Sequence, residues 1–113
     1  MRTQEQLQPI LTDLLSRLRS MLGDHIKQTI LFGSYARNDA DDGSDIDVLV
    51  LTDLPREVIR QYTWELGALA SELLLDHGVV VSPLLENWDY YRSLSDVLPL
   101  YRNVRNEGVV ISA

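Results

Sequence analysis

The sequence contains no cysteine among its 113 residues, so the chain can form neither a disulfide bond nor a thiolate metal site. It also lacks an excess of positive charge. Its 17 acidic and 10 basic residues give a net charge of −7, which argues against direct nucleic-acid binding through a basic face. An acidic balance of this size suits a metal-dependent site or a basic protein partner.

Long apolar runs are also missing, and none could cross a bilayer. The first residues are polar and do not resemble a signal peptide, so we expect no membrane contact and a cytoplasmic location. No repeat, low-complexity segment or linker divides the chain. The length and the 45% apolar content therefore predict a single domain over residues 1–113 with a modest core.

Apolar residues recur at three- and four-residue steps in two segments, 7–22 and 55–74. This spacing predicts two long amphipathic helices, which Gly23 and Gly78 are expected to terminate. Thr3 and Gln6 are expected to form a capping box at the first helix. A third segment, 87–107, is predicted to be helical or irregular with a break near its proline.

Short runs rich in β-branched and aliphatic residues predict the strands. They cover residues 28–32, 46–51, 79–85 and 109–111. The second run is almost continuously apolar, so we expect it to be buried on both faces. Pro83 indicates that the third strand either lies at an edge or ends early. Together the elements predict an α+β fold, with the long helices covering one face of a small mixed or antiparallel sheet.

The chemistry of the chain is concentrated between the first two predicted strands. Gly33 lets a phosphate approach the backbone, and Ser34 adds a hydroxyl where a helical turn is expected to begin. Asp45 and Asp47 lie two residues apart at the start of a strand, so their side chains project from one face. Two such carboxylates repel unless a cation lies between them, and Mg²⁺ is the natural occupant. The pattern predicts phosphoryl or nucleotidyl transfer.

The combination Gly33-Ser34-x10-Asp45-x-Asp47 resembles the signature of the DNA polymerase β-like nucleotidyltransferase superfamily. The longer string GSYARND…SDIDVLV resembles its minimal nucleotidyltransferase (MNT) branch, and the likeness extends over nearly the whole chain. The resemblance implies a polymerase β palm-like fold. It further implies that Gly33 and Ser34 hold the phosphates of ATP, while Asp45 and Asp47 ligate Mg²⁺ and carry catalysis.

In this branch the short protein commonly pairs with a HEPN-domain protein, often a ribonuclease toxin. The resemblance therefore implies an antitoxin that transfers AMP from ATP to a hydroxyl of its HEPN partner, with a tyrosine as the expected acceptor. The alternative is a weakly active or inactive binding module that holds the partner by contact alone.

One departure from the family pattern favours that alternative. The resemblance implies a third carboxylate, which the superfamily usually carries on a neighbouring strand, at the position that aligns with Val80. Losing it would weaken one metal site and remove the base for the nucleophile. Three nearby acids could substitute, but we interpret them as solvated surface residues: Asp76, Glu86 and Asp89.

Other candidates carry weaker signals. Arg37 could contact a triphosphate or pair with a neighbouring aspartate, and the sequence leaves both open. The acidic run of Asp39, Asp41 and Asp42 is interpreted as a solvated turn. His25 and His77 each lie near the C-terminus of a predicted helix, where a cation is favourable, and their separation predicts no zinc site.

The aromatic residues leave similar choices. Tyr62 falls on the apolar helical face and is assigned to the core, whereas Trp64 falls off that face and is the better candidate for a partner contact. Tyr90 and Tyr91 could stack on a base, but we assign them to core packing.

Overall fold

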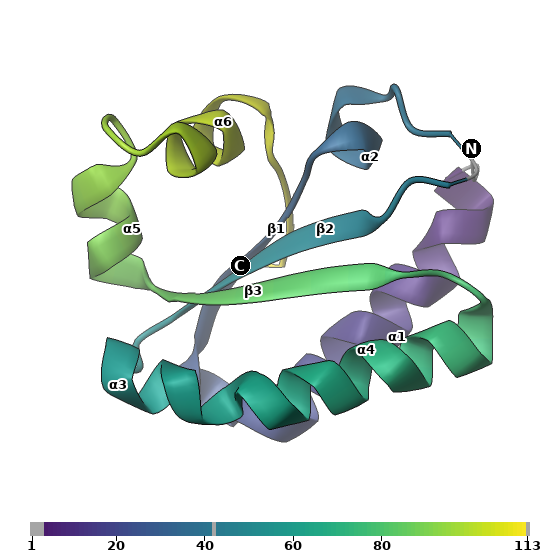
Figure 1. The fold of residues 1–113 in the computed structure, drawn as a ribbon, viewed down its shortest axis with the longest axis horizontal. Helices are drawn as coiled ribbons and strands as arrows, with labels where there is room; N and C mark the ends of the chain where they lie inside the picture. The colour runs from purple at the N-terminus through teal and green to yellow at the C-terminus, as the bar shows by residue number, and fades with distance from the viewer. Residues whose placement is uncertain (1–3, 42, 113) are drawn as a thin grey trace.

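The structure is a computed structural model that describes residues 4–41 and 43–112 (Figure 1). The predicted capping box includes Thr3, and the acidic run includes Asp42; both residues lie outside the described part. The helices are α1 (Gln4–Leu22), α2 (Ser34–Arg37), α3 (Arg56–Ile59), α4 (Thr63–His77), α5 (Trp88–Leu94) and α6 (Pro99–Glu107). The strands are β1 (Ile26–Phe32), β2 (Ile46–Thr52), β3 (Val81–Asn87) and β4 (Val109–Ser112).

The four strands form one mixed sheet in the order β3-β2-β1-β4. β1 pairs antiparallel with both β2 and β4, and β2 pairs parallel with β3. The parallel pair requires a crossover, which the segment from α3 to α4 supplies. Pro83 lies on the edge strand β3, as its missing N–H donor requires.

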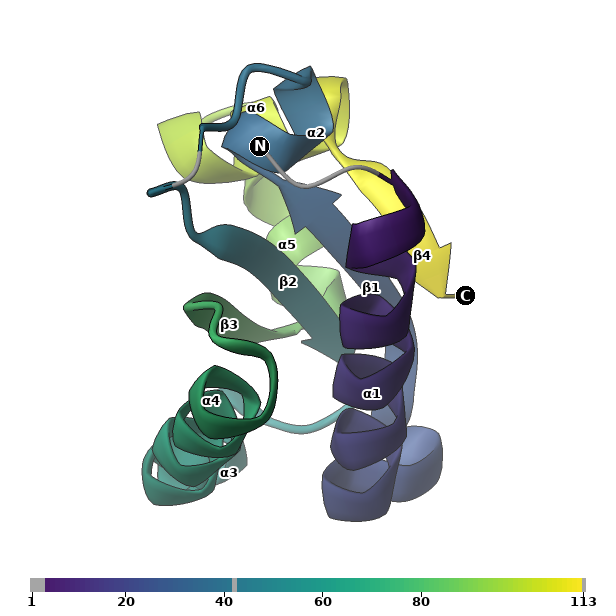
Figure 2. The same ribbon diagram turned by 90° about the vertical axis from the view of Figure 1, so that its right-hand side faces the viewer.

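Helices cover both faces of the sheet (Figure 2). The larger core joins one face to α1 and α4, with Leu14, Leu18 and Leu73 fully buried against Val48 and Val50. The smaller core lies on the other face. It joins Ile30, Leu49 and Leu51 to Tyr91 of α5 and Val104 of α6. Because β2 contributes to both cores, its apolar residues are almost completely buried, which confirms the prediction for this strand.

The α+β prediction is confirmed, and the two long helices cover one face as expected. The second long helix is interrupted, because a 3-10 turn at Arg60–Tyr62 separates α3 from α4. β3 begins two residues later than predicted and extends to Asn87. Within the described residues, no helix is long and apolar enough to span a membrane.

Candidate active site

Gly33 links β1 to the short helix α2 and lies directly against Asp47. Its backbone angles, φ +75° and ψ −152°, fall in a region that essentially only glycine occupies. Phe32 pairs with Asp47 across the β1–β2 ladder, which brings the following glycine close to the carboxylate. A methyl group at position 33 would overlap Asp47 Oδ2 and lie 3.3 Å from its Cγ. The fold therefore uses glycine here for its backbone angles and for the space that it leaves.

Asp45 and Asp47 flank Ile46 at the start of β2. Ile46 is buried in the larger core, so the two neighbouring side chains point to the opposite face, which α5 and α6 partly cover. Asp45 is exposed and Asp47 is half-buried. Within the described part of the chain, neither carboxylate has a hydrogen-bond or ion-pair partner.

Burial raises the pKa of Asp47, and the negative charge of Asp45 raises it further. The nearby positive charge of Arg37 acts in the opposite direction. The fold thus keeps two like charges close together, with Asp47 partly desolvated and without a full counter-charge. A bound cation would relieve this repulsion.

Arg37 ends α2 and forms two ion pairs. Its guanidinium lies 3.3 Å from Asp39 and 3.5 Å from Glu107 at the end of α6. Of the two readings left open by the sequence, pairing with Asp39 is present. The side chain remains exposed, so these pairs leave it accessible to a ligand. Glu107 was not predicted as a neighbour of the site, because it lies seventy residues further along the chain.

The strand beside the carboxylate pair offers no third acid at the expected position. Ile46 N donates a hydrogen bond to Val80 O, and the register then pairs Asp47 with Ser82. Val80 therefore lies opposite Asp45, on the same face of the sheet. Its side chain is 47% exposed. The neighbour that the parallel pairing brings to Asp45 is thus an exposed valine.

The three acids considered as substitutes lie elsewhere. Asp76 is on the last turn of α4 and pairs with Arg17 at 2.5 Å, and Asp89 is exposed on α5. The prediction for Glu86 as a solvated residue is wrong, because it is only 5% exposed. Glu86 pairs with Leu51, four positions along the ladder from Asp47, which corresponds to about 13 Å of strand. It therefore does not complete the site.

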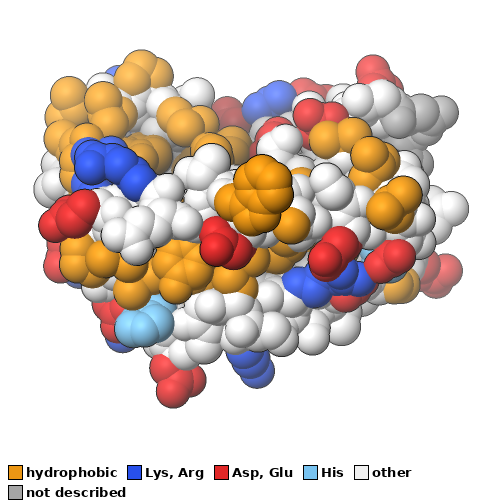
Figure 3. Space-filling model, turned by 60° about the horizontal axis from the view of Figure 1, so that its bottom comes forward, with side chains coloured by type: hydrophobic (Ala, Val, Ile, Leu, Met, Phe, Trp, Pro, Cys, Tyr) orange, Lys and Arg blue, Asp and Glu red, His pale blue; other side chains and the backbone are white. Residues whose placement is uncertain are grey.

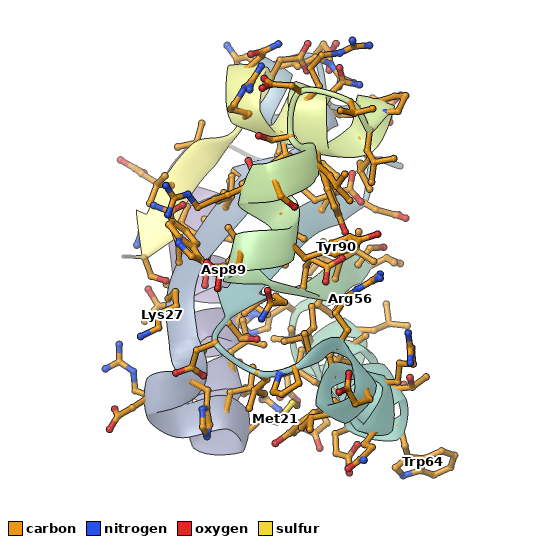
Figure 4. The ribbon with its side chains drawn as sticks, turned by 90° about the vertical axis from the view of Figure 1, so that its left-hand side faces the viewer. Met21, Lys27, Arg56, Trp64, Asp89 and Tyr90 are labelled. Atoms are coloured by element: carbon orange, nitrogen blue, oxygen red, sulfur yellow. The ribbon has the colours of Figure 1, made fainter. Side chains whose placement is uncertain are left out.

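Glu86 instead organises a polar cluster that the sequence did not reveal. It accepts hydrogen bonds from Arg56 Nε at 3.2 Å and from the hydroxyl of Tyr101. Arg56 also lies over the ring of Tyr90, 3.6 Å from its centroid (Figure 4). Tyr91 is buried, so the assignment of this tyrosine to the core is confirmed. The cluster fixes α3, α5 and α6 relative to β3.

The remaining candidates occupy structural positions. Asp41 Oδ1 accepts hydrogen bonds from Gly43 N at 2.9 Å and from the Ser44 hydroxyl at 3.2 Å, so it shapes the turn before β2. His25 pairs with Asp53, and His77 pairs with Asp13. Other residues also lie as expected: Tyr62 packs against the larger core and Trp64 is 85% exposed.

Comparison with known proteins gives the chain its family. The sequence profile of the nucleotidyltransferase domain matches residues 11–101. Two proteins of Methanocaldococcus jannaschii, both provisionally named protein adenylyltransferases, are similar along most of their length. One is 33% identical and the match covers 88% of this chain and 91% of the relative. The other is 34% identical, with 90% and 95% covered.

Solved structures show the same fold. A toxin–antitoxin crystal structure with AMP-PNP superposes with a TM-score of 0.57 at 27% identity, covering 88% of this chain and 69% of the other. A complex of tri-AMPylated Shewanella oneidensis HEPN toxin with its MNT antitoxin gives a TM-score of 0.53 at 26% identity, covering 91% and 69%. Its solved structural neighbours are MNT antitoxins, and the chain itself belongs to the nucleotidyltransferase domain family.

Proposed function

We propose that this chain is an MNT-type antitoxin that transfers AMP from ATP to a tyrosine hydroxyl of a partner HEPN toxin and so neutralises it. The observation that carries the proposal is the placement of Gly33 against Asp47, with Asp45 on the same face. Gly33, Ser34 and Arg37 would bind the triphosphate. The similarity to MNT antitoxins in complex with HEPN toxins supports the choice of partner.

The donor set of the carboxylate pair fits Mg²⁺. Two oxygen ligands lie together, and Mg²⁺ usually takes one or two carboxylates, with water and substrate phosphates completing its shell. In the described ranges, no group of three or more His, Asp or Glu residues forms a metal site. Because the pair supplies the carboxylate oxygens that Mg²⁺ prefers, we assign Asp45 and Asp47 as the metal ligands. When bound, Mg²⁺ would offset the charge of the pair and of the triphosphate.

In the proposed step, the acceptor oxygen attacks the α-phosphorus of ATP and forms the new ester bond. The bond from that phosphorus to the oxygen bridging to the β-phosphate breaks, and pyrophosphate leaves with its electron pair. The hydroxyl proton passes to solvent. Since ATP is the donor, we place the reaction in the cytoplasm.

A second candidate function is a binding module that holds its HEPN partner with weak or no transfer. The observation that favours it is Val80, which lies where relatives would supply a third carboxylate beside Asp45. A valine at this position can neither accept the proton of the acceptor hydroxyl nor act as a ligand to a second metal ion. AMP transfer predicts a labelled partner, whereas the binding module predicts an inhibited partner without label.

One assay distinguishes them. The chain is incubated with Mg²⁺, ATP labelled at the α-phosphate and a purified HEPN partner protein, and the partner is analysed by mass spectrometry. We expect labelled partner with the wild type and none with Asp47→Asn. Asp53→Asn is a matched control, because Asp53 follows the other end of β2 and pairs with His25 and Lys27.

The possible outcomes assign the function. An inhibited partner without label supports the binding module. A partner that is neither labelled nor inhibited contradicts both functions. Equal labelling by Asp47→Asn and the wild type contradicts the assigned role of the carboxylate pair.

A further inference from the structure

The outer face of α4 carries the two most exposed large apolar side chains in the described part of the chain. Trp64 is 85% exposed and Leu75 is 84% exposed. Ala68 and Ser71 lie between them at helical spacing, and both are exposed. These four residues, which we call the α4 surface, form one stripe along three turns of the helix. Exposed Trp in such a stripe is typical of a protein contact rather than of a solvated surface.

The surface is hollowed on both sides of the tryptophan. One hollow of about 530 Å³ lies between α1 and α4 and is lined by Met21 and Ala68 as well as Trp64. A second hollow of about 540 Å³ is lined by Gly67, Ala68 and Ser71 beside the same ring. The indole points away from α4 into solvent (Figure 4). A helix from another protein could therefore approach the small residues closely and pack on either side of the ring.

Negative charge borders the α4 surface on the side of α1. Four carboxylates lie along this border: Asp13, Glu65, Glu72 and Asp76. Arg17 pairs with three of them, at 2.9 Å from Asp13 and at 2.5 Å from both Glu72 and Asp76. His77 also contacts this group through Asp13. Even with that histidine protonated, negative charge remains in excess. Apolar side chains gather beside this charged group (Figure 3).

We propose that the α4 surface docks a helix of the partner HEPN protein, one that carries an apolar stripe and a basic flank. The inference rests on the proposed function for the identity of the partner. The excess carboxylates favour a basic flank over a second copy of this chain, because the chain carries a net charge of −7. α4 covers the face of the sheet opposite Asp45 and Asp47. The chain thus holds its partner and modifies it through separate surfaces.

A binding measurement without nucleotide tests the docking surface. The probe is a synthetic helical peptide of about four turns, with a leucine stripe and lysine flanks, whose fluorescence anisotropy reports binding. A peptide with glutamate flanks tests the charge requirement. Trp64→Glu is compared with Val97→Glu, a matched control because Val97 is also an exposed apolar residue (66%) but lies between α5 and α6. Both sites are exposed, so we expect neither variant to lose its fold, which thermal unfolding checks.

We expect the lysine peptide to bind the wild type and Val97→Glu equally, and Trp64→Glu at least about thirtyfold more weakly. Binding should weaken with salt and be weaker for the glutamate peptide. Absence of binding to the wild type, or equal loss in both variants, overturns the proposal. A dimer in sedimentation that Trp64→Glu abolishes would show a second copy as the occupant and also overturn it.

The outcome is independent of AMP transfer. If the HEPN partner is not labelled but the peptide binds at Trp64, the transfer activity fails while the docking surface stands. If the partner is labelled but the peptide does not bind, only the docking surface fails.

Discussion

Replacing Gly33 with alanine tests the link between backbone geometry and the carboxylate pair. The backbone at φ +75° and ψ −152° is strained for any residue with a Cβ, and the new methyl would overlap Asp47 Oδ2. The carboxylate can relieve this overlap only by rotating away from the glycine. We therefore expect Gly33→Ala to lose stability through strain and to lose nucleotide binding through displacement of Asp47.

Two other glycines supply the controls. Gly78 has φ +65°, but a Cβ there would meet nothing within 4 Å, so Gly78→Ala adds left-handed strain without a clash. Gly67 lies within α4 with open space around it, so Gly67→Ala adds neither. We expect a loss of about 2–3 kcal/mol for Gly33→Ala and about 1 kcal/mol for Gly78→Ala. Gly67→Ala should gain about 0.5–1 kcal/mol, because alanine favours the helix.

Urea and thermal unfolding measure the stabilities, and calorimetry measures Mg²⁺-dependent ATP binding. At about 4 °C per kcal/mol for a chain of this size, Gly33→Ala should melt about 10 °C below the wild type. ATP binding should be lost only in Gly33→Ala. A Gly33→Ala protein at least as stable as Gly78→Ala, with wild-type affinity for ATP, would refute the reasoning.

Three further changes probe the charged groups. Tyr101→Phe removes a hydrogen-bond donor to the buried carboxylate of Glu86, so the free energy of unfolding measured in urea should fall by about 1.5–3 kcal/mol. An unchanged free energy of unfolding would contradict the burial of this contact. Hydrogen bonds lower the pKa of Asp13, and the bond from Arg17 contributes most. The ionised carboxylate therefore stabilises the fold at pH values above the unfolded pKa, and this contribution is lost as the pH falls below about 4. Asp13→Asn should therefore weaken the fold at neutral pH and flatten its acid sensitivity, whereas an unchanged acid profile would exclude this contribution. The pKa of Asp47 is raised, so its ionised form opposes folding. Without Mg²⁺, we therefore expect Asp47→Asn to melt at a higher temperature than the wild type at pH 7 and at the same temperature near pH 3, where the wild-type carboxyl is protonated. A lower melting temperature for Asp47→Asn at pH 7 would contradict this.

Most of the fold could be predicted because its signals are local. The three- and four-residue spacing of leucines predicted α1, and the continuous apolar run of β2 predicted burial on both faces, which the two cores confirm. The break between α3 and α4 was missed, because the apolar pattern runs through the 3-10 turn without interruption. Element ends depend on hydrogen bonding, which apolar spacing does not report.

For the candidate site, the sequence supplied the residues within one short segment but not their surroundings. Residue spacing placed Asp45 and Asp47 on one face, because side chains alternate along a strand. Glu86 was misassigned, since its burial depends on Arg56 from another helix and Tyr101 from a third. A carboxylate is exposed by default, and only partners distant in the sequence make its burial favourable.

The sequence by itself determined most of the helices and strands, the α+β class and the Gly33–Asp47 motif, because each depends on residues close together in the chain. The tertiary structure decided what surrounds that motif. Parallel pairing of β2 with β3 brings Val80 beside Asp45, and antiparallel pairing with β1 brings Gly33 against Asp47. Packing of α4 on the sheet leaves Trp64 exposed. Such neighbours depend on long-range pairing and packing, which local periodicity does not specify.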